Sequence, residues 1–116
     1  MHEYSLVASV LERVQEIAEA EGNLPVTQVK LEIGVFQEVE PELLVWAFDV
    51  AKEATLAENA TLSWSSIPPK LCCDACHVEY TPEDIVFWEC PTCHGRSAVV
   101  LAGDELIIRS IALEAP

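Results

Sequence analysis

Two Cys-x-x-Cys pairs, Cys73-Asp-Ala-Cys76 and Cys90-Pro-Thr-Cys93, decide the fold of the middle of this chain. Each pair forms a tight turn that presents two sulfur atoms to one point, and two such turns together make a tetrahedral cage that suits Zn²⁺. The thirteen residues between the pairs are slightly fewer than in a typical zinc ribbon, but they leave room for the cage. Because a closed four-sulfur site has no open coordination position, we expect the site to hold structure and not to catalyse.

The same cysteines could belong to three other kinds of site, but the rest of the sequence argues against each of them. A histidine, His77 or His94, follows each pair, so each matches the attachment motif of c-type haem, but that fold would require export and further axial ligands. A rubredoxin-like iron site would resemble the second pair and leave about half of the chain unexplained. A thiol–disulfide enzyme would need a thioredoxin-like βαβ context, which is missing around both pairs.

Three residues beside the four ligand candidates have less defined roles. His77 and His94 are expected to lie on exposed flanks or to bond a ligand sulfur, although a pH-sensitive role near the metal is the alternative. Cys72 is the odd thiol, and we expect it to be a packed or spare residue and not a ligand.

Length and charge narrow the class of protein. The 116 residues suit one domain, or one domain with a small module, and the net charge of −14 comes from 20 acidic and 6 basic residues. Between positions 68 and 103 only Lys70 and Arg96 are basic, so the module should repel nucleic acid. An acidic surface suits cation traffic or a basic protein partner, though a merely soluble acidic protein would explain it equally well.

The sequence gives no sign of export or membrane insertion. No apolar run approaches the length of about 20 residues that a membrane helix needs. The N-terminal stretch lacks a basic region, and Glu12 and Arg13 interrupt its apolar residues, so we do not expect a signal peptide. We therefore expect a cytoplasmic protein, in which thiols stay reduced and metal binding is favoured over disulfides.

Hydrophobic periodicity predicts two helices and three strands outside the cysteine module. Residues 4–21 have the spacing of an amphipathic helix, and residues 26–33 alternate as a strand does. Residues 41–56 are predicted as a second helix because of their length and the proline at the first position. Shorter alternating stretches at 61–67 and 106–113 predict two further strands.

The expected fold class is therefore α+β, with two helices on a three-stranded sheet and an inserted zinc-ribbon-like module. The α/β domain should comprise 1–67 plus 104–116, and the zinc-binding module 68–103, after the Pro68-Pro69 boundary. A module of this size has too small a core to fold alone, so the metal must supply much of its stability.

The chain begins Met1-His2-Glu3, which is a second candidate for metal binding. Methionine is generally retained before a large residue, so a free α-amine, the His2 amide and the His2 imidazole can form one chelate. Such nitrogens suit a square-planar ion, Ni²⁺ or Cu²⁺, and Glu3 could complete the site through its amide or its carboxylate. On the residues alone, a frayed terminus with an incidental histidine is the more common explanation.

Taken together, the features resemble the HypA/HybF family of nickel metallochaperones for [NiFe]-hydrogenase maturation. The shared features are the MHE start, the two cysteine pairs, the VTQVKLEIG strand and the closing GDELIIRSIAL, and the resemblance extends over essentially the whole chain. The resemblance implies Ni²⁺ as transported ion at Met1, His2 and Glu3, and structural Zn²⁺ at the four paired cysteines. Some members carry an aspartate where this chain has Glu40, so we interpret Glu40 mainly as a carboxylate at a helix start.

The family's role implies partners and excludes catalysis. A HypB-type GTPase and the hydrogenase large subunit are the implied partners, and some members also serve urease. The chain has no nucleophile elbow, no phosphate-binding glycine loop and no HExxH, so we expect it not to be an enzyme. A monomer or a weak homodimer is expected. The alternative function is a zinc-ribbon adaptor that binds a protein partner and delivers no nickel.

Overall fold

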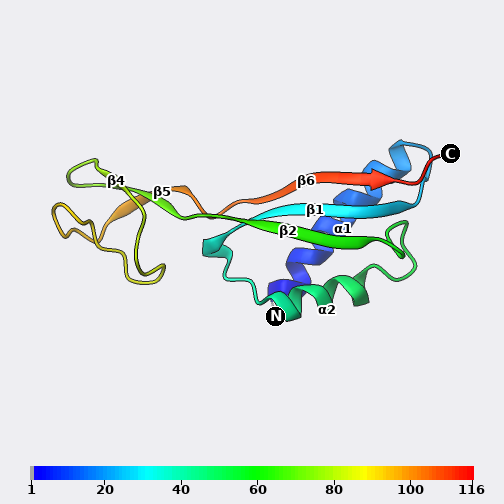
Figure 1. Cartoon of the computed structure of the whole chain (residues 1–116), viewed down its shortest axis with the longest axis horizontal. Helices are drawn as coiled ribbons and strands as arrows, with labels where there is room; N and C mark the ends of the chain where they lie inside the picture. The colour runs from blue at the N-terminus through cyan, green and yellow to red at the C-terminus, as the bar shows by residue number, and fades with distance from the viewer. Residues whose placement is uncertain (1) are drawn as a thin grey trace. The chain divides into compact units, whose positions relative to one another are not determined.

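The computed structural model describes residues 2–116 and shows an α+β fold, as predicted. The elements along the chain are α1 His2–Ala20, β1 Val26–Gly34, the 3-10 turn η1 Val35–Gln37, α2 Pro41–Ala51, β2 Thr61–Ile67, β3 Lys70–Cys73, β4 Glu79–Tyr80, β5 Ala98–Ala102 and β6 Leu106–Leu113 (Figure 1). None of the helices in this described part is long and apolar enough to cross a membrane.

The first compact unit contains both helices. It comprises the described residues up to Leu31, together with Val39–Trp64 and Ile108–Pro116. Its sheet has the strand order β2-β1-β6, so the N-terminal strand lies in the centre and the C-terminal strand at an edge (Figure 1). The two helices pack against each other, and the ring centroids of Tyr4 and Trp46 lie 6.4 Å apart.

The periodicity of the sequence explains the core of this unit. The fully buried side chains come from the predicted apolar faces, and they include Val7, Val14, Val29, Leu31 and Leu44. Burying each such side chain contributes about 1.5–3 kcal/mol, so the amphipathic helices and the alternating strand fold because they cover one another. The first helix begins at His2, two residues before the start that periodicity predicted.

The second helix is shorter than predicted. It ends at Ala51, with Lys52 as its C-cap, and not near Leu56. Ala54 has a φ of 59°, in the left-handed region that breaks a helix. The Thr55 hydroxyl then donates a hydrogen bond of 2.6 Å to the Lys52 carbonyl, which closes a turn in place of another helical turn.

The second compact unit contains all five cysteines. It comprises Glu32–Glu38 and Ser65–Ile107, and its sheet has the order β4-β3-β5, with β3 antiparallel to both neighbours. Leu71 pairs with Tyr80, and Cys73 pairs with Ala98. The domains expected from the sequence, 1–67 plus 104–116 and 68–103, are defined as parts that fold separately. These limits stay a prediction.

The core of the second unit is small. Its buried residues are Leu71, Cys73, Tyr80 and Cys90, with Phe36, Val78, Trp88, Ala98 and Val100 packed at their margin. Two of these four buried residues, Cys73 and Cys90, are also candidate metal ligands, so the same side chains form part of the core and part of the metal cluster. This is the physical reason for expecting the unit to depend on its metal.

Candidate metal centres

The four paired cysteines converge on one point, as the sequence predicted. The sulfurs of Cys73, Cys76, Cys90 and Cys93 all lie within 4.8 Å of one another. The Cys73–Cys93 sulfur pair is 3.5 Å apart and the Cys76–Cys90 pair 3.6 Å. A tetrahedral zinc with bonds of about 2.3 Å sets its sulfurs about 3.8 Å apart, so the cluster has nearly the size that this ion requires.

The two cysteine turns are built alike. The N–H of His77 donates to the Cys73 carbonyl at 2.9 Å, and the N–H of His94 donates to the Cys90 carbonyl at 2.9 Å. Both histidines have a positive φ, 61° and 62°, a conformation that histidine adopts more readily than most residues. The histidine that follows each pair therefore closes a turn through its backbone, a role that the sequence analysis did not identify.

Backbone N–H groups favour the charged form of the two buried sulfurs. The N–H of Cys93, with that of Thr92, lowers the pKa of the Cys90 thiol to about 6. The N–H of Cys76, with that of Ala75, likewise lowers the pKa of Cys73. Burial and hydrogen bonds with neighbouring cysteines raise the pKa of the other two thiols, Cys76 to about 12 and Cys93. Metal binding needs thiolates, so the backbone donors prepare one sulfur of each turn for a divalent ion such as Zn²⁺.

The neighbouring polar residues lie outside the cluster. The sulfur of Cys72 is 3.7 Å from the His77 carbonyl oxygen and is not among the four converging sulfurs, as expected. The Nδ1 atom of His94 lies 3.7 Å from a carboxylate oxygen of Glu89. The Ser97 hydroxyl donates a hydrogen bond to the carboxylate of Asp74. These contacts support the loops around the cage and leave its four sulfurs as the donor set.

The N-terminal candidate lies at the start of α1. The first helical turn contains His2 and Glu3, and the Met1 amine named from the sequence lies outside the described residues. The Nδ1 atom of His2 is 3.5 Å from a carboxylate oxygen of Glu3, and the His2 side chain is 50% exposed. The first N–H groups of a helix have no acceptor within that helix, so they are the amides best placed for binding to a metal.

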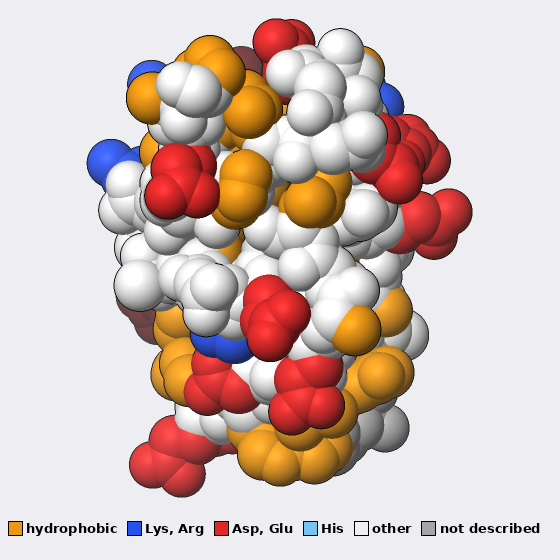
Figure 2. Space-filling model, turned by 90° about the vertical axis from the view of Figure 1, so that its right-hand side faces the viewer, with side chains coloured by type: hydrophobic (Ala, Val, Ile, Leu, Met, Phe, Trp, Pro, Cys, Tyr) orange, Lys and Arg blue, Asp and Glu red, His pale blue; other side chains and the backbone are white. Residues whose placement is uncertain are grey.

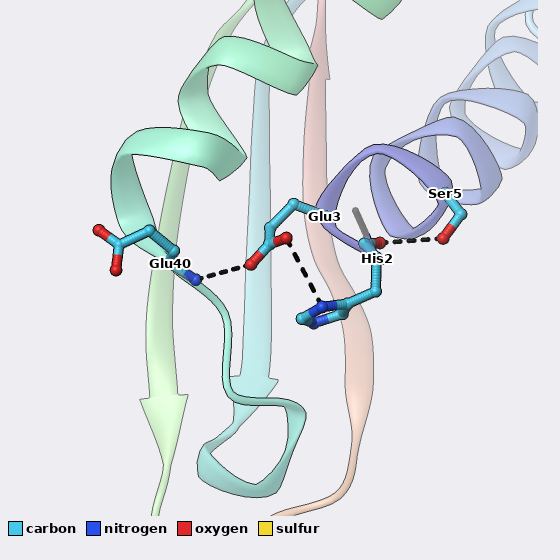
Figure 3. A network of polar contacts seen from close by, with 4 residues as sticks. All are labelled: His2, Glu3, Ser5 and Glu40. Carbon is cyan, nitrogen blue, oxygen red and sulfur yellow. Dashed lines mark hydrogen bonds and ion pairs between the residues drawn. The ribbon is translucent and has the colours of Figure 1, made fainter.

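Glu3 has an environment that sequence patterns did not reveal. It is the one charged residue buried within the described part of the chain, with 5% of its surface exposed. Its carboxylate accepts the N–H of Glu40 at 2.9 Å, which links the start of α1 to the start of α2 (Figure 3). That bond, with one from its own N–H, lowers the pKa of Glu3, so the carboxylate is charged at neutral pH.

Glu40 takes part through its backbone. It is the N-cap residue of α2, as its expected place at a helix start implies, but its side chain makes no capping hydrogen bond within residues 2–116. In Figure 3 its carboxylate points away from Glu3 while its nitrogen faces the Glu3 carboxylate. Glu3 thus supplies from another helix an acceptor for the N-cap N–H of α2, the role that a glutamate at the third helical position plays in a capping box.

The surface carries the acidic character read from the composition. Figure 2 shows carboxylates spread across one face of the molecule, with little Lys or Arg among them. Such a surface attracts cations and repels the phosphates of nucleic acid.

Comparison with known proteins identifies the family. A sequence model described as "Hydrogenase/urease nickel incorporation, metallochaperone, hypA" matches residues 1–113. The chain is 35% identical over 129 residues to a hydrogenase maturation factor HypA of Methanosarcina acetivorans, covering 98% of this chain and 96% of that protein. It is 38% identical to a hydrogenase maturation factor HypA of Acidithiobacillus ferrooxidans, covering 98% of this chain and all of that protein.

Solved structures agree with this result. The solution structure of the Ni metallochaperone HypA from Helicobacter pylori is similar, with a TM-score of 0.73, 25% identity and 98% of both chains covered. A further HypA solution structure has the same TM-score at 26% identity. Since the match extends over nearly the whole chain, this protein belongs to the HypA family of metallochaperones for nickel incorporation into hydrogenase and urease.

Proposed function

We propose that this chain binds Ni²⁺ at Met1-His2-Glu3 and delivers it for [NiFe]-hydrogenase maturation, while Cys73, Cys76, Cys90 and Cys93 hold a structural zinc. The family match carries the delivery role. The donor chemistry separates the two metals, because four sulfurs in a closed cage suit zinc, whereas an amine, amides and an imidazole suit square-planar nickel. When bound, the zinc supplies structural cross-linking and no catalytic step.

A delivery site must hold its ion and also release it. The half-exposed imidazole of His2 stands at the end of a helix, where a receiving protein can reach the ion. The zinc cage has two buried sulfurs, those of Cys73 and Cys90, beside the exposed Cys76 and Cys93, and its four thiolates leave no open coordination position, so its ion should exchange slowly. This contrast supports nickel as cargo and zinc as a permanent part of the fold.

Replacing His2 with alanine tests the nickel site. We expect His2→Ala to weaken nickel binding by about a hundredfold or more, since it removes the imidazole donor while keeping the backbone amide, and a coordination bond is worth more than an ordinary hydrogen bond. Zinc content should be unchanged. Calorimetric nickel titration of untagged protein, with zinc measured by elemental analysis, gives both values.

His94→Ala is the matched control for this experiment, since it removes another exposed histidine. It should leave nickel affinity unaltered. If His2→Ala bound one nickel as tightly as the unmodified chain, the assignment to the N-terminus would be wrong. One zinc without any His2-dependent nickel would leave the interpretation as a zinc-ribbon adaptor.

Nickel affinity should fall as the pH falls. The α-amine and an amide must lose protons to bind, and the imidazole must be neutral, so protons compete with the ion. Below the usual amine pKa of about 7.7–8.0, each unit of pH should weaken binding about tenfold or more. Titrations across this range should show the trend, and an affinity independent of pH would contradict an amine–amide–imidazole site.

The proposed partners are a HypB-type GTPase, which would work with this chain, and the hydrogenase large subunit, which would receive the nickel. The family's role in hydrogenase and urease nickel incorporation supports interaction with maturation proteins. We propose that the protein acts in the cytoplasm, where thiols stay reduced, as a monomer or a weak homodimer. The acidic surface argues against nucleic acid as a partner.

A further inference from the structure

We propose that the Glu3 carboxylate is a positioning residue and not a nickel ligand: by accepting the N–H of Glu40, it clamps the start of α1 against the start of α2 and so orders His2 for nickel. This inference rests on the proposed nickel site and assigns one side chain within it. The contact that carries it is the 2.9 Å hydrogen bond between the Glu3 carboxylate and the Glu40 nitrogen.

Both oxygens of the Glu3 carboxylate already have contacts within the protein. Glu3 is 5% exposed, and its side chain is turned toward α2, where Figure 3 shows one oxygen on the Glu40 nitrogen and the other facing His2. Binding a metal through this carboxylate would break the bond to Glu40 and leave the N–H of the N-cap residue of α2 without that acceptor. The amide of Glu3 can bind nickel without this loss.

The clamp also explains how a chain end can be ordered. The first turn of a helix frays easily because it lacks hydrogen bonds on one side. The Glu40 N–H at the start of α2 donates to the carboxylate of the third residue and so holds it, and the 3.5 Å contact of that carboxylate with Nδ1 holds the ring of His2 beside it. Donors that are ordered before the ion arrives bind it more tightly, because less conformational entropy is lost on binding.

Residue 40 offers a sharp test, since its backbone and side chain can be separated. Glu40→Pro removes the N–H, and proline suits this position because Glu40 has φ −84° and ψ 118° and precedes the helix. Glu40→Ala keeps the N–H and removes only the side chain. We expect Glu40→Pro to weaken nickel binding by about tenfold, the worth of one hydrogen bond to a charged group, and Glu40→Ala to leave it unchanged.

Variants of Glu3 separate a clamp from a ligand. Glu3→Gln keeps an oxygen that can accept the N–H and should keep most of the affinity, whereas Glu3→Ala should lose about as much as Glu40→Pro. The double variant Glu3→Ala/Glu40→Pro should be no worse than either single variant, because both remove the same bond. The visible absorption band of bound nickel should keep its position in every variant, since the ligand set does not change.

Two other results would overturn the inference. If Glu3→Ala lost nickel while Glu40→Pro kept full affinity, the carboxylate would be a ligand. If Glu40→Ala lost as much as Glu40→Pro, the side chain of residue 40 would matter instead. Hydrogen exchange at the Glu40 amide, measured without metal, reports the clamp directly: protection should be lost in Glu3→Ala. That readout does not depend on nickel, so it distinguishes failure of the clamp from failure of the nickel site, which His2→Ala tests.

Discussion

Replacing Cys90 with serine is expected to release the zinc and to unfold the cysteine-bearing unit while both helices remain. Cys90 is fully buried, and with Cys73 it forms half of the four-residue core of that unit. Structural zinc contributes about 10–16 kcal/mol in small zinc modules, far more than the remaining two buried side chains can supply. Both α1 and α2 belong to the other unit, so their stability does not rest on this core.

Because the two units should respond differently to Cys90→Ser, zinc content and the structure of each unit are measured separately. Elemental analysis should show that the zinc is lost, and amide resonances of β3, β4 and β5 should lose their dispersion. The helical signal in far-ultraviolet circular dichroism should stay close to its original value. Removal of zinc from the unmodified chain by a strong chelator should give the same pattern.

Cys72→Ser is the matched control for Cys90→Ser. Cys72 is the neighbour of a ligand candidate, but its sulfur contacts carbonyl oxygens and lies outside the four-sulfur cluster. This variant should keep its zinc and its dispersed resonances. Retention of zinc by Cys90→Ser, or loss of it by Cys72→Ser, would show that the donor set is wrong.

The sequence predicted those features that follow from local spacing. Two Cys-x-x-Cys pairs identified the sulfur cluster, because a tight turn brings the two sulfurs of each pair to one point, and a divalent ion that takes four sulfurs accounts for the meeting of the two pairs. The periodicity of α1 and β1 identified their buried faces for a similar reason. The family resemblance rested on these same local patterns.

Features that depend on contacts between distant segments could not be read from the sequence. The pairing of Glu3 with Glu40 joins residues 37 positions apart, and nothing in either local pattern marks a buried carboxylate. The early end of α2 depends on the left-handed Ala54 and the bond from Thr55, which compete with a helical periodicity that continues beyond them. An acidic residue in the first turn of a helix was a signal for Glu3, but it is usually explained by the helix dipole alone.

Gly34→Ala is expected to be among the most destabilising single substitutions in the chain. A Cβ atom at Gly34 would lie 2.0 Å from the carbonyl oxygen of Gly103 and 2.6 Å from the nitrogen of Asp104, so backbone would have to move. That backbone is held by a bond of 2.7 Å from the Gly34 N–H to the Glu105 carbonyl and one of 2.7 Å from the Phe36 N–H to the Gly103 carbonyl. Overpacking together with the strain on these bonds should cost about 3 kcal/mol or more.

Gly22→Ala provides the contrast that isolates the steric cause. Gly22 has a φ of +100° but nothing within 4 Å of an added Cβ, whereas Gly34 has an ordinary φ of −66° and a severe clash. Gly22→Ala should therefore cost only about 1–2 kcal/mol of backbone strain. Denaturant unfolding of the zinc-loaded protein, followed by amide resonances near Gly103, would measure both variants. A cost for Gly34→Ala no larger than that for Gly22→Ala would mean that the two chain segments do not approach as closely as the structure shows.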